Sequence, residues 1–340
     1  MRKFTLLLRC FAIFMKKINI FNIHNSHEFE KMALEIFQFQ AENNLVYKEF
    51  ITLLNIDIYR VEKIEEIPFL PIQFFKSHKV VSSDEAVQHI FLSSGTTGNE
   101  QSKHFVTDLS IYEESFTKGF EHFYGSISAY TVLALLPSYL ERDGSSLIYM
   151  VNDFIQKSKN EKSGFYLNNL EELAKNLVEL DKNNEKTLLI GVSFALLDLV
   201  EKHKFKLKNT IVMETGGMKG RRKELIREEL HQILREGFGV ENIHSEYGMT
   251  ELLSQAYSKG NGIFECPPWM KILTRDTEDA LTILPEGKSG GINIIDLANN
   301  NSCSFIATQD LGKTYENGTF EVLGRFDNSD IRGCNLMVMS

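Results

Sequence analysis

Six consecutive residues, Ser93-Ser94-Gly95-Thr96-Thr97-Gly98, combine four hydroxyl side chains with two glycines. Glycines let a backbone approach an anion closely, and hydroxyl groups add hydrogen-bond donors, so this composition suits phosphate binding. The segment follows an apolar run at 89–92, which predicts a buried strand that ends at this loop. Its spacing fits neither G-x-x-x-x-G-K-[ST] nor G-x-G-x-x-G. Alone, such a segment is more often a plain turn, so its interpretation depends on residues downstream.

Charged and glycine residues later in the chain could complete a phosphate site. Lys103 is the first lysine after the loop; it could neutralise a phosphate or simply be a solvated surface lysine. Gly216-Gly217 follows a predicted strand and would let a flat group lie against the backbone, unless it is only a tight turn. Thr250 and Glu251 place a hydroxyl beside a carboxylate, which suits a phosphate oxygen and a hard cation such as Mg²⁺. Asp310 could accept hydrogen bonds from a ribose diol.

A different chemistry is possible at Ser193. The sequence Gly191-Val192-Ser193-Phe194-Ala195 is close to the nucleophile elbow of α/β-hydrolases, with alanine in place of the last glycine. Three histidines follow in the order that a hydrolase permits, although none has an obvious partner context: His203, His231 and His244. A helix cap or a pocket wall is the preferred interpretation of Ser193, and a serine hydrolase remains the alternative.

Hydrophobic periodicity predicts the elements that must position these residues. Asn25 and Glu28 have capping-box spacing and precede a helical repeat. The two prolines within 67–72 require an extended segment. Further helices are predicted over 110–124, from 145, and over 170–180 and 221–235; further strands are predicted over 130–136, 186–191 and 210–214. Strands that alternate with helices predict an α/β fold with a largely parallel sheet, in which sites gather at the carboxyl ends of the strands.

Composition narrows the class of protein. The chain has 340 residues, 43% of them hydrophobic, which is enough for a substantial core. Its net charge of −9 argues against nucleic acid as the main partner. Its four cysteines include no C-x-x-C pair, which predicts reduced thiols in a cytoplasmic protein. Residues 1–14 resemble a signal peptide, but Arg9 interrupts the apolar run and no cleavage site follows. We expect this segment to be a dispensable tail or a misassigned start before Met15, and no integral membrane segment.

The chain resembles the adenylate-forming enzymes, a superfamily that includes acyl-CoA synthetases and firefly-type luciferases. Five segments occur in the order of the superfamily's core motifs: Ser93–Gly98, Thr215–Gly217, Tyr247–Glu251, Asp310 and Gly324-Arg325. Within it, the chain looks most like the LuxE-type acyl-protein synthetases, from about Phe21 to the C-terminus. That likeness rests on Pro68–Pro71, on Ser102 and His104 after the loop, and on Leu135–Tyr139. Ligases of the phenylacetate-CoA type are a more distant match.

The resemblance implies a role for each matching residue. Ser93, Ser94, Gly95, Thr96, Thr97 and Gly98 would cradle the phosphates of ATP, and Gly216 and Gly217 would line the adenine pocket. Tyr247 would stack near the adenine, with Gly248 beside it in the nucleotide site. Thr250 would contact the α-phosphate and Glu251 would bind Mg²⁺. Asp310 would bind the ribose hydroxyls and Arg325 would lie near the ribose and phosphate. Lys103 is the candidate phosphate-neutralising cation.

Two departures from the superfamily pattern matter. Gln101 occupies the position where the loop motif usually has a lysine. Ordinary members also carry a C-terminal subdomain with a lysine that supports adenylation, whereas only fifteen residues follow Arg325 here, none of them lysine. We therefore expect the large N-terminal domain of the adenylate-forming fold over 15–322, with a short remnant of the hinge and subdomain over 323–340. Such a shortened chain is expected of the protein-acylating branch.

The expected function is ATP-dependent activation of a long-chain fatty acid and transfer of the acyl group to a protein thiol. In the LuxE-type enzymes a cysteine near the C-terminus carries the acyl group, and Cys334 is the match; Cys266 and Cys303 are expected to be packing residues. Arg332 would favour the Cys334 thiolate. By analogy, an acyl reductase would be the partner that receives the acyl group. The alternatives are a CoA ligase of the phenylacetate type, the hydrolase at Ser193, and a nucleotide-binding scaffold without turnover.

Overall fold

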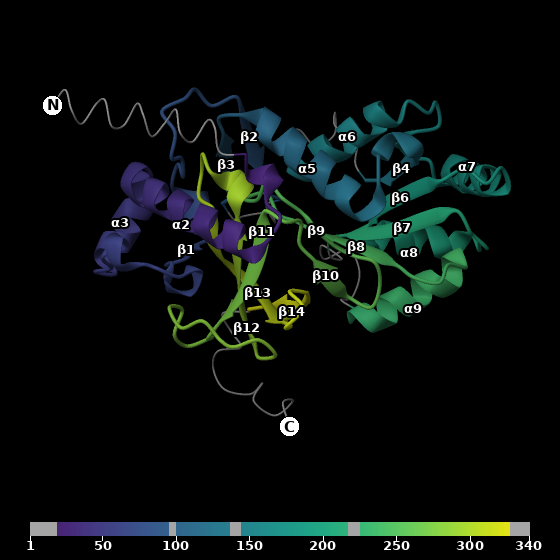
Figure 1. The fold of residues 1–340 in the computed structure, drawn as a ribbon. Helices are drawn as coiled ribbons and strands as arrows, with labels where there is room; N and C mark the ends of the chain where they lie inside the picture. Colours follow the sequence, from purple (N-terminus) through teal and green to yellow (C-terminus); the bar gives the residue numbers. More distant parts are fainter. Residues whose placement is uncertain (1–18, 95–99, 137–143, 217–224, 327–340) are drawn as a thin grey trace.

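The computed structural model describes residues 19–94, 100–136, 144–216 and 225–326, and within them a 12-stranded sheet crosses the whole molecule (Figure 1). Its strand order is β11-β12-β13-β14-β10-β9-β8-β7-β6-β4-β5, with β1 added beside β13. One half of this sheet is parallel and the other is antiparallel. The two halves meet where β8 pairs with β9.

The parallel half has the α/β arrangement that the sequence predicts. Its strands are β4 (Thr131–Leu135), β5 (Gly164–Phe165), β6 (Thr187–Val192), β7 (Thr210–Thr215) and β8 (His244–Tyr247). Its helices are α5 (Leu109–Tyr124), α6 (Ser146–Ser158), α7 (Leu170–Lys182), α8 (Ser193–Lys202) and α9 (Arg227–Phe238). Figure 1 shows α5 and α6 on one side of these strands and α8 and α9 on the other. Both faces are thereby covered, so β4 and β6 are buried along their full length.

The second half consists of antiparallel strands, so the prediction of a largely parallel sheet is wrong for this half. Its strands are β9 (Ala256–Ser258), β10 (Ile263–Glu265), β11 (Met270–Arg275), β12 (Ser289–Asp296), β13 (Phe305–Thr314) and β14 (Phe320–Arg325). Adjacent strands in this half run in opposite directions. Short turns join β9 to β10 and β13 to β14, as antiparallel pairing allows.

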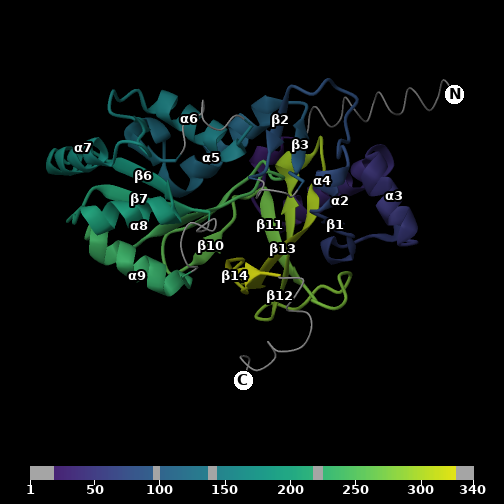
Figure 2. The same cartoon turned by 180° about the vertical axis from the view of Figure 1, so that it is seen from behind.

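The N-terminal segment packs against this antiparallel half. It contains α2 (Ser26–Asn43), α3 (Leu45–Leu53), β1 (Leu70–Pro71) and the short α4 (Phe74–Ser77), together with 3₁₀ turns at Ile20–Asn22, Ile58–Arg60 and Ile64–Glu66. Two further 3₁₀ turns are η4 (Ile127–Ala129) and η6 (Leu297–Asn299). The proline-containing segment is extended, as predicted, because Leu70 and Pro71 pair in parallel with Ile306 and Ala307 of β13. Figure 2 shows the same packing from behind.

The predicted N-cap of α2 is confirmed at Asn25, although the Glu28 side chain bonds the N–H one residue before the cap, where a capping box would bond that of Asn25. The Asn25 side chain accepts a hydrogen bond from the Glu28 N–H at 2.9 Å, and Glu28 accepts one from the His24 N–H. The helix then buries its periodic apolar residues: Phe29, Ala33, Ile36 and Phe37. The predicted helices over 110–124, from 145 and over 170–180 are confirmed as α5, α6 and α7.

Two predicted elements need correction. The run at 89–92 is a strand, β2 (His89–Leu92), but it pairs with β3 (Lys103–Val106) in a separate two-stranded sheet, and only Phe91 is buried. The glycine-rich loop therefore connects a hairpin and does not follow a strand of the main sheet. Helix α9 begins at Arg227, because Leu225 and Ile226 are not helical. The alternating charges that predicted an earlier start do not determine the residue at which the helical backbone hydrogen bonds begin.

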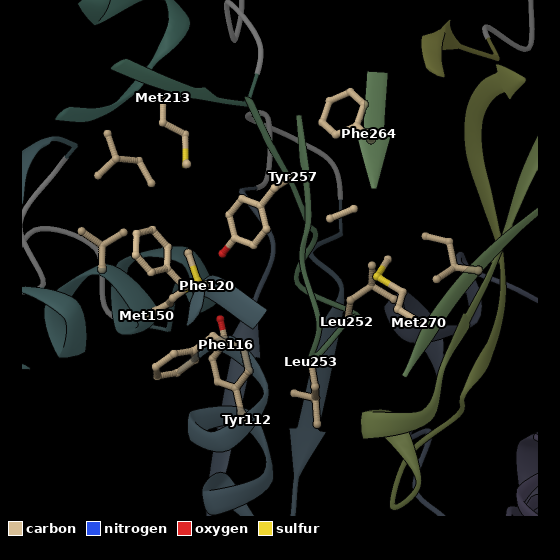
Figure 3. Packing of buried hydrophobic residues seen from close by; sticks show 14 of the residues in the cluster. Tyr112, Phe116, Phe120, Met150, Met213, Leu252, Leu253, Tyr257, Phe264 and Met270 are labelled. Atoms are coloured by element: carbon tan, nitrogen blue, oxygen red, sulfur yellow. The ribbon is translucent and has the colours of Figure 1, made fainter. Parts of the chain in front are cut away.

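One hydrophobic core joins the two halves (Figure 3). Aromatic rings of α5 pack against Tyr257 of β9, whose ring lies 6.3 Å from that of Phe120 and 5.6 Å from that of Tyr124. Each such fully buried side chain contributes about 1.5–3 kcal/mol to the stability of the fold. The ring nitrogen of Trp269 also donates to Ser115 of α5 and to Ser254, both at 3.0 Å. No helix in the described parts of the chain is both long and apolar enough to cross a membrane.

Candidate functional site

The β2–β3 hairpin closes the ends of the Ser/Thr/Gly loop with a small hydrogen-bond network. The N–H of Ser93 donates to the carbonyl of Ser102 at 3.1 Å, and the N–H of Ser102 donates to Ser93 Oγ at 2.9 Å. Gln101, at the position of the usual lysine, donates its side-chain amide to the Ser93 carbonyl at 2.8 Å. Ser93 therefore orders the base of the loop, and Ser94 is exposed beside it. Gly95, Thr96, Thr97 and Gly98 lie outside the described residues.

Strand alternation separates Lys103 from its neighbours in β3. Ser102 and His104 are buried on one face, whereas Lys103 is exposed on the other. Burial raises the pKa of the Glu251 carboxyl, and among the described residues the positive charges that oppose this effect are those of Arg325 and Lys76. Lys76 lies in α4. The sequence did not indicate a role for it, because a lysine at the end of a packed apolar segment is typical of the protein surface. No local pattern could have brought it to Glu251.

Thr250 and Glu251 lie in the turn between β8 and β9, where the sheet changes from parallel to antiparallel. Glu251 is only 5% exposed, and burial raises the pKa of its carboxyl, an effect opposed chiefly by a hydrogen bond from the Ser102 side chain. The Thr250 carbonyl lies 2.9 Å from Nδ1 of His104. The turn thus contacts β3 at both residues, and the hydroxyl–carboxylate pair meets the base of the glycine-rich hairpin.

Asp310, Tyr247 and Arg325 form a second cluster. The Tyr247 hydroxyl donates to one Asp310 oxygen at 2.8 Å, and Arg325 Nε lies 3.1 Å from the other. Asp310 and Arg325 are directly paired across β13 and β14. The Arg325 side chain is 80% exposed, so much of its guanidinium is open to a ligand. Burial, followed by the Asp310 charge, raises the pKa of Tyr247, which keeps its hydroxyl protonated as a donor.

Gly248 follows Tyr247 at a place where a side chain does not fit. A Cβ atom there would lie 2.5 Å from Oε1 of Glu246, so glycine allows the chain to pass this buried carboxyl. Glu246 accepts a hydrogen bond from the Thr215 hydroxyl at 2.5 Å. Burial, with a smaller contribution from the neighbouring Glu214 charge, raises the pKa of Glu246 to about 7. Sequence inspection missed Glu246, because a single acidic residue before the motif carries no pattern.

Gly216 takes the conformation that favours glycine, with φ of 65°, at the end of β7. The Ser193 hydroxyl donates to its carbonyl at 2.7 Å and lies 3.2 Å from Oε2 of Glu214. Ser193 is 2% exposed, and its hydroxyl bonds a carbonyl and a carboxylate rather than a histidine. Nε2 of His231 lies 3.6 Å from Oε1 of Glu214, the carboxylate oxygen that Ser193 does not contact. The carboxylate therefore lies between serine and histidine, whereas a nucleophilic serine needs the histidine beside it. Ser193 supports the Gly216 turn; Gly217 lies outside the described residues.

Cys266 and Cys303 behave as the packing residues that the sequence predicted. Cys303 is fully buried, and burial raises the pKa of its thiol to about 12. Burial likewise raises the pKa of the Cys266 thiol. Neither is a thiolate at neutral pH, so neither is prepared to accept an acyl group. Cys334 lies outside the described residues.

The family model described as acyl-protein synthetase, LuxE, matches residues 149–340, more than half of the chain. The chain belongs to the LuxE acyl-protein synthetase family. This match includes the Thr250–Glu251 turn and the cluster around Asp310. No curated protein matches the sequence of this LuxE-family chain.

Solved structures of acyl-CoA ligases share the fold of this LuxE-family protein. The 2-hydroxyisobutyryl-CoA ligase, in complex with 2-HIB-AMP and CoA, is 12% identical with a TM-score of 0.67, over 90% of this chain and 70% of the ligase. ATP-bound MatB from Rhodopseudomonas palustris is 17% identical with a TM-score of 0.52, over 72% of this chain and 49% of MatB. A long-chain-fatty-acid-CoA ligase, FadD1 from Archaeoglobus fulgidus, is 17% identical with a TM-score of 0.52, over 72% and 52%. The chain spans about half the length of MatB and FadD1. Over most of its length it therefore has the mixed α/β fold of the adenylate-forming ligases.

Proposed function

We propose that this LuxE-family protein activates a long-chain fatty acid with ATP and passes the acyl group to a cysteine thiol. The observation that carries the proposal is the contact of the Thr250–Glu251 turn with the hairpin that bears the Ser/Thr/Gly loop. That contact brings a buried carboxylate beside the ends of a loop suited to phosphate. Membership of the acyl-protein synthetase family supports the same reaction.

The residues fit Mg²⁺ and ATP. Mg²⁺ is commonly held by one or two carboxylates together with phosphate oxygens of the substrate, and Glu251 can supply such a carboxylate. Asp310 has each oxygen engaged by one protein donor, which leaves further lone pairs for a ribose diol. The Arg325 guanidinium is largely exposed and would contact the ribose and phosphate. When bound, Mg²⁺ would supply charge neutralisation at the phosphates.

The proposed reaction has two steps. In the first, the fatty-acid carboxylate attacks the α-phosphorus of ATP, the bond to the β-phosphate oxygen breaks, and pyrophosphate leaves. Thr250 would donate its hydroxyl to the α-phosphate, while the loop N–H groups hold the leaving phosphates in line. In the second, a cysteine thiolate attacks the acyl carbonyl carbon and AMP leaves, which yields a thioester.

Cys334 is the thiol that we propose as the acceptor. Phe326 is fixed to β13, because its N–H donates to the Gln309 carbonyl at 2.7 Å. The chain from Phe326 to Cys334 can reach at most roughly 29 Å when fully extended. Since Arg325 contacts Asp310, a thiol on this length of chain can be brought to the nucleotide site. An acyl reductase that takes the acyl group from the thioester would be the partner protein.

ATP–pyrophosphate exchange across a panel of fatty acids tests the first step. We expect exchange that depends on Mg²⁺ and on long-chain acids; no exchange with any acid would refute acyl activation. The second step is tested by incubation with ATP, Mg²⁺ and labelled fatty acid, followed by hydroxylamine. Cys334→Ser should lose the labile label and keep exchange, whereas the matched Cys266→Ser should keep both. Label that persists in Cys334→Ser, or that appears only on added CoA, would exclude Cys334 as the acceptor.

A further inference from the structure

Two successive carbonyl groups in the turn after β8 each accept a hydrogen bond from a fully buried side chain. The Thr250 carbonyl is 2.9 Å from Nδ1 of His104, and the Glu251 carbonyl accepts from the Asn299 side chain at 2.7 Å. His104 and Asn299 both have 0% exposure. They belong to β3 and η6, which lie far from the turn in the sequence. The backbone of the proposed catalytic pair is therefore held from two sides.

The His104 ring has one protonation state that fits its surroundings. A carbonyl oxygen only accepts, so Nδ1 carries a proton. Burial lowers the pKa of His104 to about 4, so the ring remains neutral at physiological pH. The other nitrogen, Nε2, is buried and has no hydrogen-bond partner among the described residues. The ring instead packs edge-on against Phe75, with the ring centroids 5.7 Å apart and the ring planes at 90°.

Strand β3 carries this histidine together with the base of the glycine-rich loop. Ser102 and His104 lie two residues apart on the same face, and both contact the turn: Ser102 at the Glu251 side chain and His104 at the Thr250 backbone. Ser102 also exchanges two hydrogen bonds with Ser93 across the hairpin. A shift of the hairpin must therefore move Thr250, or break the bond to His104.

We propose that His104 is a positioning residue, whose Nδ1–H fixes the Thr250 carbonyl so that the Thr250 hydroxyl keeps its register with the phosphate-binding hairpin. This inference rests on the proposed function, since it assigns the residue that aligns the same site. His104 touches no substrate in this scheme and acts through Thr250 alone. Its loss should consequently lower kcat more than it changes KM for ATP.

Three variants separate positioning from general packing. His104→Phe keeps a buried ring beside Phe75 but removes the donor, whereas His104→Asn keeps an N–H donor near the position of Nδ1. Phe75→Leu is the matched control, because it weakens the ring contact and leaves the hydrogen bond. We expect His104→Phe to reduce kcat of pyrophosphate exchange by about 10–100-fold, with KM for ATP nearly unchanged. His104→Asn should recover a substantial part of the lost kcat. Phe75→Leu should lower Tm without a comparable loss of kcat. Wild-type kcat in His104→Phe would overturn the proposal.

A spectroscopic measurement tests the hydrogen bond without any turnover. In protein labelled with ¹⁵N-histidine, the ring signals that disappear in His104→Asn identify His104. They should report a neutral ring protonated at Nδ1; a ring protonated at Nε2 would overturn the proposal. If the wild type shows no exchange with any acid, the proposed function fails. In that case the ¹⁵N ring signals still test the Nδ1–H bond to the Thr250 carbonyl, because they do not depend on turnover.

Discussion

At Thr250 and Glu251 the backbone and the side chains have separate tasks. Their carbonyl groups are held by the protein through His104 and Asn299, and in the proposed reaction the Thr250 hydroxyl and the Glu251 carboxylate contact the substrate and Mg²⁺. A side-chain change that leaves the backbone in place should therefore affect chemistry much more than stability.

Thr250→Ala and Glu251→Gln should each suppress pyrophosphate exchange by about 10²–10³-fold, because each removes one oriented contact to developing charge. Tm measured without nucleotide should stay close to that of the wild type. Glu241→Gln, at an exposed position, serves as the control and should keep full exchange. Near-wild-type exchange in Glu251→Gln would remove the assignment of this carboxylate to Mg²⁺.

Glu246 gives the stability of the fold a pH dependence of known sign. Its pKa is about 7 in the folded protein, against an ordinary value of 4.5, because burial disfavours the charged form. The folded state thus binds the proton more tightly than the unfolded state, and this group lowers stability as pH rises from 4.5 to 7. Below 4.5 the penalty is absent, and above 7 it is complete.

Glu246→Gln should accordingly be more stable than the wild type at pH 8, by about 1–3 kcal/mol, and equal to it near pH 4.5. Glutamine can still accept from Thr215, so the hydrogen bond is not lost. Urea unfolding at several pH values measures the difference, with Glu241→Gln as an exposed control. A variant that is less stable than the wild type at pH 8 would show that the ionised carboxylate is favoured where it lies.

At the scale of elements, α2 supports the site from a distance. Gln40 of α2 is fully buried; its amide donates to the carbonyls of Asn299 and Asn300 at 2.9 and 3.0 Å, and its oxygen accepts from the Ser304 N–H at 2.9 Å. Asn299 in turn donates to the Glu251 carbonyl. One glutamine on the N-terminal helix therefore fixes η6, which fixes the turn.

Gln40→Leu should destabilise the protein by about 2–4 kcal/mol, because it leaves several buried backbone groups without partners. It should also reduce exchange under conditions where the protein remains folded. Gln38→Leu, a half-buried position on the same helix, is the matched control and should change neither quantity comparably. Chemical unfolding and exchange on the same samples provide the comparison; equal effects of the two changes would argue against the network.

Elements with a local cause could be predicted from the sequence, and those with a distant cause could not. Asn25 and the apolar repeat after it lie within one segment, which is why α2 was predicted with its cap. The place of β2 in a separate hairpin depends on its pairing with β3, and an apolar run alone does not encode a partner. The site follows the same division. Thr250, Glu251 and Asp310 were found as motif residues, whereas His104 was noted only for the family likeness, and no local pattern encodes its contact with Thr250, 146 positions away.

At the scale of the whole molecule, the sequence of residues 1–14 predicts a dispensable tail or a misassigned start before Met15. We expect protein that begins at Met15 to have the same Tm and the same exchange activity as the full chain. A lower Tm, or loss of exchange, in the shortened protein would show that the first fourteen residues contribute to the fold or the site.

The bond between Gln40 and Ser304 joins positions 264 residues apart, and this has a consequence for synthesis on the ribosome. At about 5–20 residues per second, α2 emerges roughly 15–50 seconds before the strand it packs on has been made. Throughout that interval Gln40 and the aromatic face of α2 lack their final neighbours. The nascent N-terminal segment therefore exposes an apolar helix face during that interval, and α2 can reach its final packing only after the strand that begins at Phe305 has been made.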